Sequence, residues 1–375
     1  MNTSTTIALD ATYAADPQPT GIGIYSERLI NALGTVVPSK GPGSPRVVLG
    51  FRPGPFVKRA WRQHWPANFR IAPLADNWIT MPPADLFHGL NQRLPNRPYA
   101  LRVVTLHERF PAPSDDYSTA EFRAHMSQRI DHALAAAHRI IVVSDSVGRH
   151  LASHCPELAP KIRVVHHGVD PSAPVSEQQR RAFLHERVGL PPGQPFFANV
   201  GAVQIRKNLK NLALALEPIE NVHLVIAGND GYGATEIRAF IAQQGLAERV
   251  HFIGHLQPAE LQILYASAVA LVFPSLEEAF GMPILEAMSC DCPVITSNVA
   301  AMPEVAGDAA LLIDPQDVAA LRAAMQRVLT DTALAASLRQ QGLRRAALFS
   351  WEKCARETWA VYEELLATQE KTERV

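Results

Sequence analysis

The segment VALVFPSLEEAFGMPILE, Val269–Glu286, joins a short apolar run to a helical pattern. The run Val269–Phe273 is apolar throughout, which is typical of a parallel strand that is covered on both faces. Pro283 suits the first position of a helix, where its missing N–H costs no hydrogen bond. The backbone amides just before it would point out of the helix start and form an anion site. The residues that carry these amides are Ala279, Phe280, Gly281 and Met282.

Two carboxylates flank this turn. Glu278 stands just before it and Glu286 lies in the first turns of the helix, so both side chains can reach one cleft. Carboxylates readily accept hydrogen bonds from sugar hydroxyls. The alternative is that both residues merely favour the positive end of a helix dipole. The combination with the strand and the anion turn favours a binding role.

The same alternation of strands and helices continues through the 375 residues, enough for two domains of ordinary size. Strands are expected at Ile7–Ala11, Val47–Phe51, Asp85–Gly89, Leu101–Leu106, Ile140–Ser144, Phe196–Val200, Leu224–Ala227, His251–Ile253, Val269–Phe273, Val294–Thr296 and Ala310–Ile313. This pattern predicts an α/β protein with two Rossmann-like, doubly wound parallel sheets. Ligands should then bind at the carboxyl ends of the strands, in the cleft between the domains. The polar stretch Val169–Gln194 is interpreted as the link between them.

A basic turn follows the first strand of the second half. GAVQIRKN, Gly201–Asn208, places Arg206 and Lys207 side by side where the chain leaves the strand for a helix. Two adjacent cations at such a turn can clamp a diphosphate. A solvated basic turn is the alternative, and the acidic turn further along the chain makes the clamp the preferred interpretation.

Two weaker signals lie in the first half. TGIGIY, Thr20–Tyr25, predicts a glycine turn before a helix, where the backbone at Gly21 and Gly23 could approach a phosphate. NAD binding is disfavoured because Ser26 stands where a third glycine belongs and no acidic residue ends the second strand. His107 ends the strand in VVTLHE, a place where a lone histidine is more often structural than catalytic.

Together these motifs resemble retaining glycosyltransferases of family 4, which have the GT-B fold. PSLEEAFGMPILE is similar to the E-x7-E region of that family, and the RKN turn is similar to its phosphate-binding turn. Further similar segments are FHGLNQRLP, IIVVSDSVGRHL, KIRVVHHGVD and FSWEK, so the resemblance covers nearly the whole chain. Two departures are Ala202, where some relatives carry an arginine, and Glu108, where relatives usually carry aspartate.

The resemblance implies a role for each motif. Glu286 would hold the ribose hydroxyls of a nucleotide, and Glu278 would hold hydroxyls of the donor sugar. Arg206 and Lys207 would neutralise the leaving diphosphate, while His107 would lie beside the transferred sugar. Gly21 and Gly23 would face the donor phosphates and the acceptor.

The resemblance also implies the domain roles. Residues 1–170 would bind the acceptor, residues 171–350 would bind the nucleotide sugar, and the helix in residues 351–375 would return to the N-terminal domain.

The first-half motifs are closest to bacterial polysaccharide mannosyltransferases, which favours GDP-mannose as donor and a saccharide or lipid-linked saccharide as acceptor. A UDP-sugar donor, a GT-B-like nucleotide-sugar epimerase and a non-catalytic nucleotide-sugar-binding subunit are the alternatives. No metal or cofactor is expected, because the sequence contains no DxD pair and no HExxH motif. Same-face attack by the acceptor is the expected retaining route.

Composition limits the partners. The net charge of −1 gives no general attraction to nucleic acid, and the four cysteines have no zinc-ligand spacing. No signal peptide is recognised, so a cytoplasmic protein is expected. The stretch Arg28–Ala75 has eight basic residues and no acidic one. Within it Phe56–Trp65 interleaves cations with Trp61 and Trp65, which suggests the hypothesis of peripheral docking on an anionic membrane surface, with an ordinary solvated face as the alternative.

Overall fold

The computed structural model describes residues 5–17, 19–38, 44–54, 57–74, 83–96, 99–110, 117–191 and 193–373. The chain divides into two compact units. The first unit comprises Met1–Pro113, Ala120–Gly168 and Ser350–Val375. The second unit comprises Val169–Phe349 and the short stretch Ser114–Thr119.

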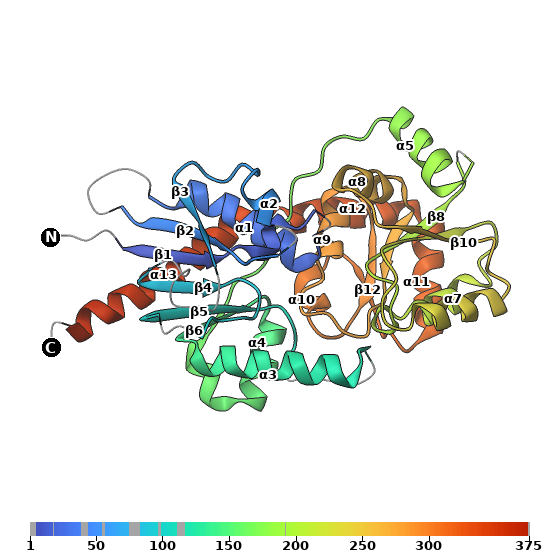
Figure 1. Cartoon of the computed structure of the whole chain (residues 1–375). Coiled ribbons are helices and arrows are strands. Elements are labelled where there is room, and N and C mark those ends of the chain that lie inside the picture. Colours follow the sequence, from blue (N-terminus) through green and yellow to red (C-terminus); the bar gives the residue numbers. More distant parts are fainter. Residues whose placement is uncertain are drawn as a thin grey trace. The chain divides into compact units, whose positions relative to one another are not determined.

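The first unit is built on a seven-stranded sheet with the order β3-β2-β1-β4-β5-β6-β7, in which every neighbouring pair is parallel. Its strands are β1 Thr6–Asp10, β2 Arg46–Phe51, β3 Phe69–Pro73, β4 Leu86–Gly89, β5 Leu101–Leu106, β6 Arg139–Val142 and β7 Ile162–Val164. Its helices are η1 Thr12–Ala15, α1 Gly21–Val36, α2 Val57–Ala60, α3 Ala120–Ala136, α4 Asp145–His154, η3 Pro156–Lys161 and α13 Trp351–Glu373 (Figure 1).

The second unit has a six-stranded sheet with the order β10-β9-β8-β11-β12-β13, again parallel throughout. Its strands are β8 Phe196–Val200, β9 His223–Ala227, β10 Val250–Gly254, β11 Ala270–Phe273, β12 Val294–Ser297 and β13 Leu311–Ile313. Its helices are α5 Glu177–Phe183, η4 Leu184–Val188, η5 Ile205–Lys207, α6 Leu209–Leu216, α7 Ala234–Gln243, α8 Pro258–Ser267, α9 Met282–Ser289, α10 Met302–Ala306, α11 Val318–Thr330 and α12 Thr332–Ala346.

The apolar runs explain why these segments are central strands. β4, β11 and β12 are buried at every residue, as expected for parallel strands with helices on both faces. The prediction of two doubly wound parallel sheets is therefore confirmed. In each sheet the strand order reverses once, between β1 and β4 in the first unit and between β8 and β11 in the second. Such a switch point opens a crevice at the carboxyl ends of the strands, where ligands of α/β proteins bind.

The segment Val169–Gln194, which was interpreted as the link between the domains, is not without secondary structure, and its Pro192 lies outside the described residues. The segment contains α5 and the π-turn η4. Ser176 and Gln179 form a capping box at the start of α5, and Phe183 and Leu184 are buried. The surrounding polar residues hid this short amphipathic helix. The strand predictions also omitted β3 and β7.

The last helix, α13, belongs to the first unit and packs along α1 (Figure 1). Its Tyr362 hydroxyl lies 2.6 Å from Nδ1 of the buried His88 on β4. At its start, a Cβ on Gly168 would lie 2.2 Å from the backbone nitrogen of Trp351, so only glycine lets the two segments approach this closely.

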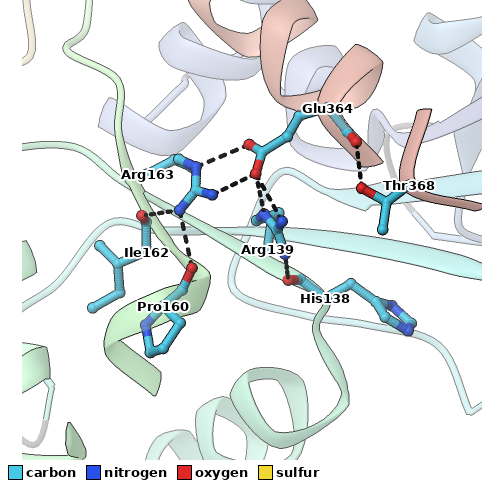
Figure 2. Close-up of polar contacts among 7 residues, drawn as sticks. All are labelled: His138, Arg139, Pro160, Ile162, Arg163, Glu364 and Thr368. Carbon is cyan, nitrogen blue, oxygen red and sulfur yellow. Dashed lines mark hydrogen bonds and ion pairs between the residues drawn. The ribbon is translucent and has the colours of Figure 1, made fainter. Parts of the chain in front are cut away.

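Glu364 joins α13 to the strands β6 and β7 (Figure 2). Its Oε1 lies 2.7 Å from Nη2 of Arg139 on β6 and 2.5 Å from Nη2 of Arg163 on β7. Its Oε2 accepts a further hydrogen bond from Nε of Arg163 at 2.9 Å. The hydrogen bonds from Arg163 and Arg139 lower the pKa of Glu364 to about 2. This carboxylate joins three segments that are far apart in the chain.

We expect Glu364→Gln to lower the melting temperature near pH 7 by roughly 1–3 °C, because a neutral amide loses the charge attraction to both guanidinium groups and its NH2 group cannot accept the hydrogen bond from Arg163 Nε. The folded pKa of Glu364 lies below its unfolded value, so this stabilisation is present above about pH 4.5 and is lost as pH falls through about 2. Thermal unfolding of both proteins between pH 3 and pH 8 tests this. Glu352→Gln is the matched control, since Glu352 on the same helix pairs with the exposed Arg356 one turn away. An equal effect of both variants would contradict a special role of Glu364.

Candidate active site

Two turns of the second unit meet at its switch point. The basic turn η5 follows β8, and the acidic turn Pro274–Gly281 follows β11. Asn208 adopts a left-handed conformation with φ of 57°, and its Nδ2 donates to the carbonyl oxygens of Pro274 (3.1 Å) and Pro315 (2.7 Å). The backbone N–H of Leu276 donates to Arg206 O at 2.9 Å. These bonds hold the two turns together.

The cations and the first carboxylate predicted from sequence lie in direct contact. Lys207 Nζ donates to Glu278 Oε1 at 2.6 Å, and Arg206 Nη1 lies 2.7 Å from Glu278 Oε2. Arg206 Nη1 also donates to Glu277 O at 2.5 Å. We call Arg206, Lys207 and Glu278 the cation–carboxylate cluster.

The cluster is largely removed from water. Lys207 is 6% exposed and Glu278 is 9% exposed, whereas the Arg206 side chain is 25% exposed. Burial alone would raise the pKa of Glu278, but Lys207 and Arg206 lower it to about 2. Burial lowers the pKa of Lys207, and the Glu278 charge opposes this. With Glu278 ionised and two cations beside it, the cluster carries a net positive charge that suits an anion.

Neighbouring groups restrict the Lys207 side chain. Its ammonium group lies 4.4 Å from the centroid of the Phe273 ring, a favourable cation–π contact. On another side, Gly201 has φ of 138°, and a Cβ there would lie 2.8 Å from Lys207 Cε. A glycine is required at this position both by its backbone conformation and by the space that Lys207 needs.

Helix α9 carries the second carboxylate. It begins at Met282 after Gly281, whose φ is 101°, so Pro283 occupies the second helical position and the expectation of the first was wrong by one residue. Glu286 Oε2 accepts a hydrogen bond from the Tyr265 hydroxyl of α8 at 2.9 Å. Burial raises the pKa of Glu286, while the hydrogen bond from Tyr265 lowers it. Sequence reasoning missed Tyr265, since a tyrosine in an apolar helical pattern looks like a core residue.

In the first unit, His107 follows β5 directly. Its Nε2 lies 2.8 Å from Leu90 O, and its ring meets the Tyr25 ring edge-on with centroids 4.6 Å apart. A carbonyl oxygen only accepts, so Nε2 carries the proton and Nδ1 of the neutral ring is an acceptor. Burial lowers the pKa of His107 to about 4, although its bond to Leu90 opposes this. His107 is therefore neutral near pH 7.

A chain of buried hydrogen bonds lies beneath His107. The Tyr25 hydroxyl lies 3.0 Å from Thr105 Oγ1, which lies 2.8 Å from Nε2 of His88. The chain ends at the hydroxyl of Tyr362 on α13. It ties α1, β5, β4 and α13 to one another. Nothing in the local sequence indicated it, because its members are scattered over the unit.

The glycines of TGIGIY do not form the flexible turn that was expected. Helix α1 already begins at Gly21, so Gly21 and Gly23 lie in its first turn. A Cβ on Gly23 would lie 3.0 Å from Tyr13 O and 2.9 Å from Pro19 Cβ. Gly23 is therefore needed for close packing of the preceding segment against the helix start. A role in binding phosphate stays a prediction, as do the roles of the other site residues.

We expect Gly201→Ala to destabilise the protein by about 1–3 kcal/mol, because it forces an unfavourable backbone conformation and displaces Lys207. Gly245→Ala is the control, since Gly245 also has positive φ, 71°, but has open space where the Cβ would lie. Denaturant unfolding of both variants gives the comparison. Equal losses of unfolding free energy in the two variants would show that Lys207 can move aside without destabilising the protein.

Family models and known proteins are similar to this chain over most of its length. Residues 180–345 match the family model Glycosyl transferases group 1, and residues 27–173 match Glycosyltransferase Family 4. O-antigen chain mannosyltransferase B of Escherichia coli is 29% identical over 340 residues, which cover 86% of this chain and 84% of that protein. The MMP alpha-(1->4)-mannosyltransferase of Mycolicibacterium hassiacum is 40% identical over 139 residues, 36% of this chain and 33% of that protein.

Among solved structures, sucrose-phosphate synthase from Thermosynechococcus elongatus matches with a TM-score of 0.76 at 25% identity, covering 97% of this chain and 100% of that one. The resemblance inferred from the motifs is thereby confirmed. The chain is a glycosyltransferase of family 4 with the GT-B fold.

Proposed function

We propose that the protein transfers a hexose, with retention of configuration, from a nucleotide-diphosphate sugar to a saccharide or lipid-linked saccharide acceptor in cell-surface polysaccharide synthesis. The cation–carboxylate cluster at the switch point of the second unit is the observation that carries this proposal. It combines positive charge for a diphosphate with a carboxylate for sugar hydroxyls, at the place where ligands of such sheets bind.

In this proposal each group has a separate task. Arg206 and Lys207 bind the diphosphate and stabilise the charge that develops on it, so no metal ion is required. The backbone amides at Ala279–Met282 lie at the positive end of α9 and add to this stabilisation. Glu278 accepts hydrogen bonds from the donor sugar, and Glu286, oriented by Tyr265, accepts them from the ribose.

His107 positions the transferred sugar in the same proposal. Its Nδ1 is an acceptor, so it can receive a hydrogen bond from a sugar hydroxyl without a change of protonation. With a pKa of about 4 it is poorly suited to donate a proton at neutral pH. The buried chain beneath it holds the neighbouring Tyr25 in place.

The transfer itself follows the same-face route. The bond between the anomeric carbon and the phosphate oxygen breaks, and the acceptor oxygen bonds to that carbon from the same side. The acceptor hydroxyl gives its proton to the departing phosphate oxygen. Configuration is retained without a covalent enzyme intermediate.

Mannose from GDP-mannose is the donor we favour. The support is that the E. coli and M. hassiacum relatives are both named as mannosyltransferases. A UDP-sugar is the alternative donor. A nucleotide-sugar epimerase is the alternative activity, and it would convert the donor without an acceptor.

A thermal-shift panel tests the proposal. It compares GDP, UDP, ADP and their sugar conjugates in the presence of EDTA. A ligand at 100 times its dissociation constant stabilises the folded state by about 2.7 kcal/mol, which is visible as a higher melting temperature. We expect GDP and GDP-mannose to shift the wild type and to lose this effect in Glu286→Ala. The exposed Glu220 provides the control variant Glu220→Ala, which should respond like the wild type.

If no nucleotide shifts the wild type, the assignment of the nucleotide site is wrong. Selective stabilisation by UDP would indicate the alternative donor, a UDP-sugar. The anomeric configuration of the product tests the route, because an inverted product or a trapped glycosyl-enzyme adduct contradicts same-face attack.

We further propose that the segment Phe56–Trp65 docks on an anionic membrane surface. Phe56 lies outside the described residues, but Trp61 is 56% exposed and is flanked by the exposed cations Arg59 and Arg62. In the described part of the chain no helix is long and apolar enough to cross a membrane. Co-sedimentation should therefore increase with the anionic lipid content of vesicles and fall in Trp61→Ser/Arg62→Ser. Equal binding to neutral vesicles would contradict this docking.

A further inference from the structure

Both cations proposed for the diphosphate already have an anionic partner. Glu278 uses one carboxylate oxygen for Lys207 and the other for Arg206, at 2.6 and 2.7 Å. Its two oxygens thus occupy the positions next to the cations that phosphate oxygens would take. An arriving diphosphate must share these cations with Glu278 or displace it.

The Lys207 side chain has little room to move away from Glu278. The Phe273 ring and the backbone at Gly201 enclose its side chain, and it is 6% exposed. Glu278 lies on the acidic turn, which is bonded to the basic turn through Asn208 and Leu276. A bound diphosphate would therefore lie beside a retained, ionised carboxylate.

The two nucleotide ligands of the proposed reaction differ in how they meet that carboxylate. The donor carries two negative charges on its phosphates. Its sugar hydroxyls can donate hydrogen bonds to Glu278, and these replace the hydrogen bonds that Arg206 and Lys207 give to the phosphates instead. The product diphosphate has no sugar, and its terminal phosphate, with a second pKa of about 6, adds up to one further negative charge at neutral pH. Glu278 should repel the product more than the donor.

We propose that Glu278, by occupying Arg206 and Lys207 in the free protein, makes the site select the intact sugar nucleotide over the nucleoside diphosphate product. This inference rests on the proposed function and assigns Glu278 a second task beyond contact with the sugar. Release of the product is then aided because Glu278 competes with the phosphate oxygens of the product for Arg206 and Lys207.

Calorimetric titration of Glu278→Gln tests the proposal, because glutamine keeps the shape of the side chain and removes its charge. GDP should bind about tenfold more tightly to the variant than to the wild type. The affinity for GDP-mannose should rise less or fall, so the ratio of the GDP to the GDP-mannose dissociation constant decreases. Inorganic pyrophosphate, which has neither base nor sugar, should also bind more tightly. If the thermal-shift panel shows that UDP is the nucleotide that binds, the same titrations use UDP and its sugar conjugate.

Two controls separate this effect from simpler ones. Glu220→Gln removes one exposed carboxylate of the same unit and should leave both affinities unchanged, which excludes a general charge effect. Glu286→Gln should weaken GDP and GDP-mannose together and leave pyrophosphate unaffected, since Glu286 is assigned to the ribose. A merely structural role of Glu278 predicts weaker binding of every ligand, the opposite sign.

The inference is overturned if Glu278→Gln binds nucleotides with an unchanged or increased ratio. Should this variant not fold, Glu278→Ala is titrated with pyrophosphate. Tighter binding than to the wild type agrees with the inference, and weaker binding contradicts it. Failure of the proposed function looks different, because then the wild type and all variants bind no nucleotide.

Discussion

The buried pairing of Lys207 with Glu278 is the interaction on which the second unit's site depends. Lys207 and Glu278 are each less than 10% exposed, and burial of their opposite charges is tolerated because the two groups neutralise each other. The pair joins the turns after β8 and β11, two strands that lie side by side in the sheet but about 70 residues apart in the chain. A charged pair at this place sets the position of Arg206 as well, since it binds the other carboxylate oxygen.

In the first unit, the side chains at the candidate site are held in position by neutral groups instead of a buried ion pair. His107 lies at the carboxyl end of β5, and burial keeps its ring neutral. Behind it, hydroxyl groups and His88 connect four elements through hydrogen bonds that need no ionised member. Neutral networks of this kind orient side chains without the desolvation penalty of buried charge. The final helix completes the network with Tyr362 and is fastened separately through Glu364.

Much of the fold could be predicted from local patterns. Apolar runs such as ALVF and LVIA identify central parallel strands because few other segments are buried on both faces. Short elements were missed: in α5 polar neighbours conceal the buried Phe183, and β7 is a three-residue strand whose residues are all half-buried. The TGIGIY segment was misjudged because glycine permits a turn and also permits close packing, and only the position of Tyr13 decides between them.

The sequence by itself determined the fold class, the family, and the residue types of the candidate site, because strand–turn–helix patterns and the cations and carboxylates in them are local features. Only the tertiary structure decided which of these residues touch. It paired Lys207 and Arg206 with Glu278, gave Tyr265 to Glu286, and fixed the protonated nitrogen of His107 through Leu90. These contacts join strands, turns and helices that are distant in sequence, and neither spacing nor composition carries information about such distances.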